Sequence, residues 1–334
     1  MKRNSFIMFT LSIAAILCVA SRGLPAGEVW TPSTGDVDLD EPTEAEPYAQ
    51  YKHAAALLAS GEPRSAAKQL TSLIQEHPDA SWIDDAHYLL GLARFNLGSY
   101  KPAFIIWQEL QNKGPESDRA QHLFQLQKKA LTKIARRDLD SALPLYDQLV
   151  EVAPDQSSGA QAQKAKADAL FEDKRFRHAS DQYLALIDYF PGSTSVPYAW
   201  YKIGVSELEM AKWIGRGTDR LTLAIQRFRD FIHNFPEHRL VSQAREKLKE
   251  AQRLRMEKYS RIAEYYLGPA RQPSAALPYL QEISHNLPDE RGGKWAKEQI
   301  QDTETTEKTP RRGRVRPMSL PGVTDNNEKE DNTE

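Results

Sequence analysis

The stretch that decides the fold is DDAHYLLGLARFNLGSYKPAFIIWQELQNKGP, residues 84–115. Its first part places Tyr88 and Phe95 two helical turns apart within an apolar pattern. The dipeptide GS breaks this pattern, and a second one runs from Tyr100 to Pro115, where the proline removes a backbone donor and stops the helix. The stretch therefore predicts two helices joined by a short turn.

The same pattern recurs six times along the chain, and each copy ends at a proline. These prolines are Pro78, Pro115, Pro154, Pro191, Pro236 and Pro288. Alanine lies twelve positions before each one, at Ala66, Ala103, Ala142, Ala179, Ala224 and Ala276. A large apolar residue lies eight positions before, at Leu70, Trp107, Tyr146, Tyr183, Phe228 and Leu280. Such self-similarity predicts an all-α solenoid of about six helix pairs, since one pair cannot bury its apolar face alone.

A small residue also lies 24 positions before the proline in the first four units. These residues are Ala54, Gly91, Ala130 and Ala167. Small side chains on both helices of a pair allow the axes to approach to about 8–10 Å. The large residue eight positions before the proline is then expected to fill the remaining gap.

The intervals between the prolines are 37, 39, 37, 45 and 52 residues, so the last two units are irregular. In the fifth unit the small residue is Gly204, and about eight residues are inserted around 212–221. The sixth unit is expected to begin with one long, charged helix over 239–266. Since regular repeats need only stack, specific function is expected in the irregular units.

Composition limits the functional classes. The net charge is −2, so no overall positive field would attract nucleic acid. The only cysteine is Cys18, which excludes a disulfide framework and a cysteine-based zinc site.

Residues 1–20 are predicted to be an export signal. Lys2 and Arg3 precede an apolar run over residues 6–20, which is short for a membrane span. Small residues favour cleavage after Ala20. Lipidation of Cys18 is the alternative, although the bulky Leu17 fits a lipoprotein signal poorly, and an uncleaved anchor is a third reading.

The flanks of the repeat array are predicted to be disordered. Residues 21–47 form an acidic, proline-interrupted linker, and residues 301–334 form a charged tail with few apolar residues. The basic part of this tail could contact an anionic surface, but a solubilising tail is favoured. The repeat array is expected over residues 48–300.

The repeat pattern resembles the tetratricopeptide repeat (TPR), for which LLG at 89–91, Ala103, Trp107 and Pro115 match the signature well. Residues of about 160–288 further resemble the BamD family, the repeat lipoproteins of the bacterial outer-membrane β-barrel assembly machine. The insertion, the long helix and the sequence YSRIAEYY at 259–266 carry this resemblance.

The BamD resemblance implies a division of labour. The N-terminal repeats of that family are implicated in holding unfolded barrel proteins, and the C-terminal repeats in docking to the barrel-inserting partner. This chain departs from the family pattern in two respects: two additional units end at Pro78 and Pro115, and a final repeat after Pro288 is missing.

No catalytic motif for phosphate binding, nucleophilic hydrolysis or zinc proteolysis occurs in the sequence. His233 and His238 flank Pro236, which prevents them from sharing one helical face. We therefore expect no enzymatic activity and no cofactor or metal.

The candidate binding residues form two sets. The repeat resemblance places a peptide groove along the first helix of each pair, lined by Tyr48, Tyr51, Asp85, Tyr88, Asn96, Tyr198 and Tyr201. Tyrosine combines rigid apolar area with a polar tip, which suits extended peptides, although each could instead pack between neighbouring units. Partner docking is expected in the irregular half, at Trp213, Ile214, Arg216, Tyr265 and Tyr266.

The sequence thus favours an exported, non-catalytic scaffold of outer-membrane barrel assembly. It would be periplasmic and associated with the outer membrane, with barrel-assembly components and unfolded outer-membrane proteins as partners. The alternative is a soluble periplasmic TPR adaptor for cell-wall enzymes or a Tol–Pal-type envelope complex. An exported enzyme is disfavoured because the motifs are missing.

Overall fold

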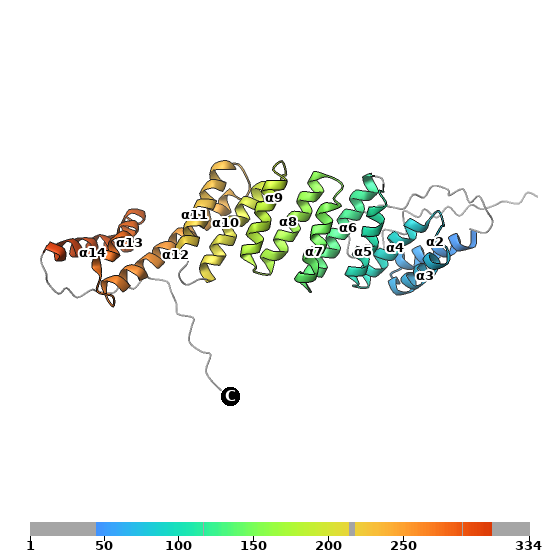
Figure 1. Ribbon diagram of the computed structural model, residues 1–334, viewed down its shortest axis with the longest axis horizontal. Coiled ribbons are helices and arrows are strands. Elements are labelled where there is room, and N and C mark those ends of the chain that lie inside the picture. Colours follow the sequence, from blue (N-terminus) through green and yellow to red (C-terminus); the bar gives the residue numbers. More distant parts are fainter. Residues whose placement is uncertain (1–44, 116, 214–217, 289, 309–334) are drawn as a thin grey trace, which may run out of the picture. The chain divides into compact units, whose positions relative to one another are not determined.

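The computed structural model describes residues 45–115, 117–213, 218–288 and 290–308. These residues form thirteen α-helices and no strand, which confirms the all-α expectation (Figure 1). The helices are α2 (Ala45–Ala59), α3 (Pro63–Glu76), α4 (Ile83–Asn96), α5 (Tyr100–Asn112), α6 (Ser117–Ala135), α7 (Leu139–Glu151), α8 (Gln156–Glu172), α9 (Phe176–Tyr189), α10 (Val196–Trp213), α11 (Thr218–Asn234), α12 (Val241–Leu267), α13 (Pro273–Asn286) and α14 (Arg291–Lys308). None of these helices combines the length and apolar composition that a membrane crossing requires.

The helices from α2 to α13 form the six predicted pairs, and α14 follows the last pair. By its internal contacts the chain divides into two larger compact parts. We call them the first unit, which ends at Ile203 within α10, and the second unit, which begins at Gly204. A single array over residues 48–300 was expected, whereas the boundary between the units falls in the first irregular repeat. Residues 21–44 of the predicted linker and the signal at 1–20 lie outside the described residues.

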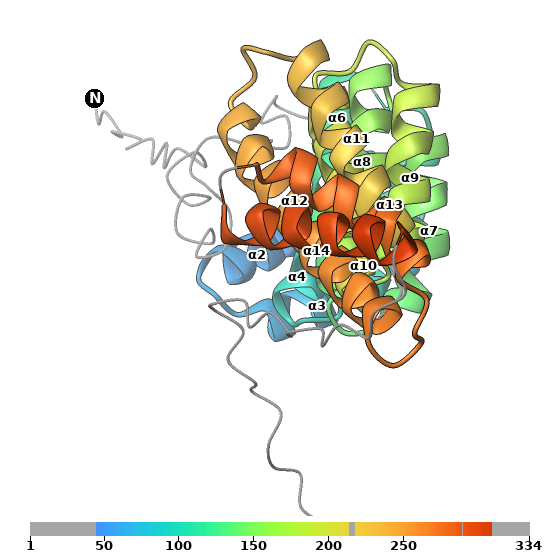
Figure 2. The same ribbon diagram turned by 90° about the vertical axis from the view of Figure 1, so that its left-hand side faces the viewer.

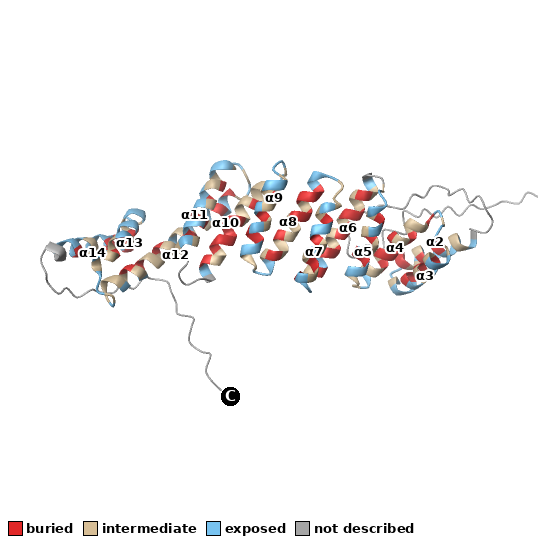
Figure 3. Cartoon of the chain, viewed as in Figure 1, coloured by how far each residue is buried: buried red, intermediate tan, exposed pale blue. Residues whose placement is uncertain are grey.

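The residues that repeat before each proline are the core of the helix pairs. All six alanines that lie twelve positions before the prolines are 0% exposed. The six large residues at the eighth position are also fully buried, with Tyr146 the most exposed at 1%. Figure 3 shows buried residues on the helices and exposed residues at many of the helix ends and turns. Burying each large side chain stabilises its pair by roughly 1.5–3 kcal/mol.

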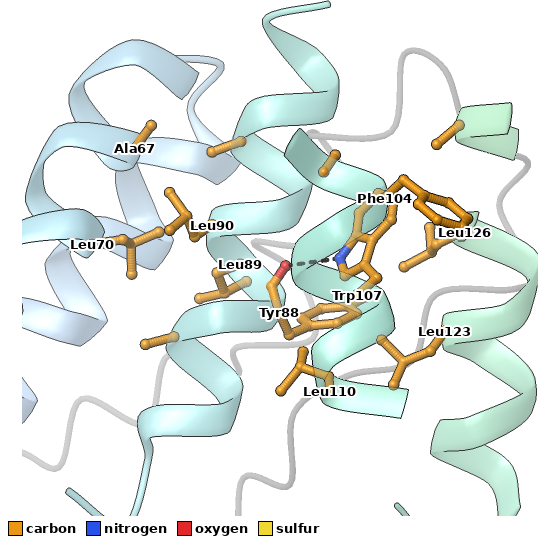
Figure 4. Close-up of a cluster of buried hydrophobic side chains, with 14 of the residues drawn as sticks. Ala67, Leu70, Tyr88, Leu89, Leu90, Phe104, Trp107, Leu110, Leu123 and Leu126 are labelled. Atoms are coloured by element: carbon orange, nitrogen blue, oxygen red, sulfur yellow. Dashed lines mark hydrogen bonds between the residues drawn. The ribbon is translucent and has the colours of Figure 1, made fainter. Parts of the chain in front are cut away.

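The contact between Gly91 and Trp107 shows why the first helix needs a small residue. A Cβ atom added to Gly91 would lie 2.2 Å from the indole Nε1 of Trp107. That indole is 0% exposed, and its N–H donates to the carbonyl oxygen of Tyr88 at 3.4 Å (Figure 4). Gly204 repeats this arrangement in the second unit, where an added Cβ would lie 2.9 Å from Phe228.

The insertion in the fifth repeat lengthens both helices of the pair. The helix α10 ends nine residues after Gly204, whereas α4 ends five residues after Gly91. Likewise α11 begins ten residues before Phe228, whereas α5 begins seven residues before Trp107. Since one helical turn takes 3.6 residues, the insertion adds about one turn to each helix.

The C-terminal helices partly revise the expected boundaries. The helix α12 is continuous over 27 residues, as predicted for the long charged helix. The helix α14 continues to Lys308, so residues 301–308 are helical. The prediction of a disordered tail from residue 301 onward is therefore wrong for these residues. Trp295 and Ala296 are buried against Leu280 and Ile283, which explains why α14 packs on α13 (Figure 2). Residues 309–334 lie outside the described residues.

Gly91→Ala is expected to destabilise the protein although alanine normally favours a helix. The added methyl group would overlap a buried indole that has no room to move, and such overpacking costs about 1–3 kcal/mol. Urea unfolding followed by circular dichroism measures this loss. Gly192→Ala is the matched control, because no heavy atom lies within 4 Å of its added Cβ. Equal unfolding midpoints for the two variants would contradict this packing.

Candidate protein-binding surfaces

The first helices of successive pairs contact one another through their side chains in the first unit. We call this surface the first-helix face; it comprises α2, α4, α6, α8 and the part of α10 up to Ile203. The predicted peptide-contacting residues all lie on these helices. Their contacts determine which of them are available to a ligand.

Aromatic side chains gather at the N-terminal end of the first-helix face. The rings of Tyr48 and Tyr51 stack at 5.8 Å, and Tyr51 also stacks on Trp82 at 5.3 Å. Tyr51 is only 7% exposed, and burial raises the pKa of its hydroxyl. Tyr48 is half-buried, with the ammonium of Lys52 4.4 Å from its ring centroid. Tyr48 is therefore the residue of this group that remains accessible.

The helices α4 and α6 are joined by two polar contacts at predicted residues. The hydroxyl of Tyr88 and Nε2 of His122 lie at hydrogen-bond distance, 2.9 Å apart. The carboxylate of Asp85 pairs with Arg119 at 3.2 Å, while burial raises the pKa of that carboxyl group. Tyr88 is 1% exposed, so its side chain packs between the repeats in this structure. Asn96, in contrast, is exposed at the end of α4.

A second polar network joins α8, α9 and α10 around Asp168. The hydroxyls of Tyr183 and Tyr198 donate to Oδ1 of Asp168 at 2.5 and 2.8 Å. Lys164 donates to Oδ2 of the same carboxylate at 2.6 Å. Tyr198 is half-buried, as is the predicted residue Tyr201 one turn further along α10. Asp168 thus fixes the orientation of a predicted binding residue.

Sequence reasoning missed Asp168 and the lysines around it. Lys164 lies 4.0 Å from the ring centroid of Tyr198, and Lys202 lies 3.3 Å from that of Phe171. Burial lowers the pKa of Lys202, with Lys164 contributing in the same direction. The only sequence signal for these lysines is their spacing of 38 residues, which is close to the repeat length.

A cavity of about 360 Å³ adjoins this network. Residues of α6, α7 and α8 line it, among them Thr132, Tyr146 and Asp168, and Arg136 follows α6 at its rim. Burial raises the pKa of Tyr146 to about 12. Among the described residues, no group of histidine, cysteine and acidic side chains is arranged to hold a metal ion.

The predicted docking residues in the second unit are partly described. Trp213 is the last residue of α10, while Ile214 and Arg216 lie outside the described residues. Tyr265 is 57% exposed on α12, and its ring contacts Tyr266 at 5.7 Å. Tyr266 in turn stacks on Tyr279 of α13 at 6.2 Å. Tyr266 and Tyr279 are half-buried, so the three rings form one aromatic surface of which Tyr265 is the most accessible part.

Ion pairs hold the added turns of α10 and α11 in the second unit. Lys212 bridges Glu209 and Glu250 at 2.7 and 2.8 Å, which joins α10 to α12. Lys258 of α12 donates to the carbonyl oxygen of Ala211 at 2.8 Å. Arg220 of α11 pairs at 2.9 Å with Glu207, which is only 9% exposed. The lengthened pair is therefore attached to the long helix by specific contacts.

Comparison with known proteins supports this description. A family model described as YfiO, an outer membrane lipoprotein, matches residues 117–292, more than half of the chain. A second model, described as a tetratricopeptide repeat, matches residues 51–115. The family match begins earlier than residue 160, where the sequence resemblance was placed. Two helix pairs, α2–α3 and α4–α5, precede the matched residues, in agreement with the two additional N-terminal repeats expected from the sequence. A search of curated proteins finds no match.

Solved structures give distant likenesses. A crystal structure of YrrB, described as a TPR protein with an unusual peptide-binding site, is 20% identical, with a TM-score of 0.35 over 61% of this chain and 95% of that chain. The TPR domain of P58(IPK) is 17% identical, with a TM-score of 0.30 over 79% of this chain and 70% of that chain.

Asp168→Ala is expected to destabilise the first unit by about 1–3 kcal/mol. The substitution leaves the hydroxyl of the buried Tyr183 without its acceptor, and an unsatisfied buried donor costs that much. Urea unfolding measures the loss. Asp147→Ala is the matched control. Asp147 pairs with Lys166, but its side chain is 57% exposed, and exposed ion pairs contribute little to the free energy of unfolding. Equal losses in the two variants would contradict a stabilising role for the Asp168 network.

Proposed function

Because the chain belongs to the YfiO family of outer membrane lipoproteins and is a TPR protein-interaction scaffold, we propose that it serves in the assembly of outer-membrane β-barrel proteins. The family match over residues 117–292 is the observation that carries this proposal. The protein would be exported, periplasmic and associated with the outer membrane, and it would act without catalysis or a cofactor. The export signal would be cleaved after Ala20, with lipidation of Cys18 as the alternative.

The first-helix face would hold extended segments of unfolded outer-membrane proteins. Tyr48, Tyr198 and Tyr201 are half-buried, so each presents part of its ring to a ligand. The hydrogen bond from Tyr198 to Asp168 fixes one of these rings before a ligand arrives. A preordered surface loses less conformational entropy on binding than a mobile one. Tyr51 and Tyr88 would support this face from within the protein.

The second unit would dock to the barrel-inserting partner. Tyr265, Tyr266 and Tyr279 form an aromatic surface there, and tyrosine is enriched among the residues that dominate protein interfaces. The lengthened pair α10–α11 lies in the repeat at which the compact units divide. The alternative, a periplasmic adaptor for cell-wall or Tol–Pal-type complexes, would use the same surfaces for other partners.

Tyr201→Ala is expected to weaken binding of an extended outer-membrane protein segment by at least about fivefold, since loss of an aromatic contact residue costs at least about 1 kcal/mol. Fluorescence anisotropy with a labelled segment and the purified full chain measures the affinity. Tyr189→Ala is the control, because Tyr189 is 74% exposed at the end of α9, a second helix. Indistinguishable titration curves for Tyr201→Ala and the unaltered protein would count against the peptide-holding role.

Tyr265→Ala is expected to reduce recovery of the barrel-inserting protein when the tagged full chain is isolated from crosslinked cell envelopes. The substitution removes the most exposed ring of the aromatic surface, while segment binding at the first-helix face should persist. Tyr189→Ala should recover the partner normally. Recovery of cell-wall enzymes or Tol–Pal components in its place, with the unaltered bait, would support the adaptor alternative.

A further inference from the structure

We propose that a cavity at the N-terminal end of the first unit binds an arginine residue of a partner protein. The cavity measures about 250 Å³ and lies where α3 ends and α4 begins. Pro47 in the first turn of α2, Glu76 at the end of α3 and residues of the following turn line it. This inference goes beyond the proposed function, because none of the lining residues belongs to the predicted peptide groove.

The wall of the cavity contains a buried hydrogen-bond donor. Trp82 lines the cavity and is only 3% exposed. Its indole N–H has no acceptor among the residues that the structure describes. The indole N–H of the buried Trp107, in contrast, donates to the carbonyl oxygen of Tyr88. Because an unmatched buried donor costs free energy, a ligand atom that accepts from Trp82 would remove that cost.

Ring contacts hold the indole of Trp82 in place. Tyr51 stacks on it with the ring centroids 5.3 Å apart and an interplanar angle of 22°. The ring of His77, tilted by 59°, lies 6.4 Å away and also lines the cavity. The donor is therefore fixed before a ligand arrives, so little conformational entropy is lost when an acceptor binds.

Two carboxylates determine the charge of the ligand. Glu76 and Asp79 both line the cavity and are exposed, whereas no lysine or arginine lines it. Glu76 accepts a hydrogen bond from Oγ of Ser72 at 2.6 Å. Within the described part of the chain, neither carboxylate has an ion pair and Asp79 has no hydrogen bond. The cavity is therefore negative, which favours a cationic ligand and disfavours a carboxylate.

An arginine residue matches this combination of groups. Its planar guanidinium binds carboxylates through paired hydrogen bonds. Pro47, Pro78 and Ala80 offer apolar surface to the aliphatic part of the side chain. The main-chain carbonyl of the same ligand supplies the acceptor that Trp82 requires. The segment that directly precedes α2 does not supply the cation, since residues 23–44 contain no lysine or arginine.

The test compares two short labelled peptides of Gly, Ser and Thr that differ at one central position. One carries arginine there, and the other carries citrulline, which has nearly the same shape but no charge. Fluorescence anisotropy with the full chain at low salt should show about fivefold tighter binding of the arginine peptide, as pairing with exposed carboxylates would give. The difference should shrink as salt screens the charges.

Two substitutions separate the contributions of charge and hydrogen bonding. Asp79→Asn should remove most of the preference for arginine while it leaves the affinity for the citrulline peptide unchanged. Trp82→Phe keeps a ring but lacks the N–H, so it should weaken both peptides by the same factor of about threefold to tenfold. Asp188→Asn is the matched control, because Asp188 is likewise exposed but lies on α9, and it should change neither affinity.

Equal affinity for the two peptides, or a preference that survives in Asp79→Asn, would overturn the inference. Circular dichroism checks the folding of each variant, and the Asp79→Asn result decides the matter if Trp82→Phe fails to fold. Free arginine that competes as well as the arginine peptide would identify a small-molecule site instead of a protein contact. Tighter peptide binding after replacement of Arg311, Arg312, Arg314 and Arg316 by Gln would identify the chain's own tail as the occupant. Either of these two results would also overturn the inference, and all these outcomes leave the proposed function intact.

Discussion

The structure depends on a contact between a small residue on the first helix of a pair and a large residue on the second, seen in the pairs α4–α5 and α10–α11. Trp107 fills the space that Gly91 leaves, and Phe228 does the same at Gly204. The contact brings two backbones close together, and the alanine at the twelfth position before each proline lets them remain close. Stacking of the pairs follows, because each pair still has an apolar face to bury.

This contact also explains how much could be predicted. It joins residues only sixteen positions apart in the regular pairs, so a small and a large residue recur at this spacing in each regular repeat. The core positions, the six pairs and the long helix α12 were predictable for that reason. The extent of α14 was not, because its packing on α13 through Trp295, Ala296 and Ile300 follows no repeated pattern. The division after Ile203 leaves no local signal either.

The candidate sites were less predictable because accessibility depends on neighbouring repeats. Tyr88 and Tyr201 occupy the same position of their first helices, three residues before Gly91 and Gly204. Yet Tyr88 is buried and has His122 beside its hydroxyl, while Tyr201 is half-buried. For Tyr88 the outcome depends on α6, which supplies His122, and the polar side chains of α6 follow no apolar period. Asp168 and its lysine partner went unnoticed for the same reason.

The broken repeat shows where such an array can gain a new function. An insertion within either helix would rotate the large residue away from its small partner. The eight additional residues instead lie between Gly204 and Phe228, at the end of the pair where the helices meet, and Phe228 still packs on Gly204. The added turns are then secured by Lys212, Glu250 and Lys258 rather than by the core. An insertion inside the packed part of a pair would break the core contact. The ends of the helix pairs are therefore the places at which a partner surface can be added without loss of the fold.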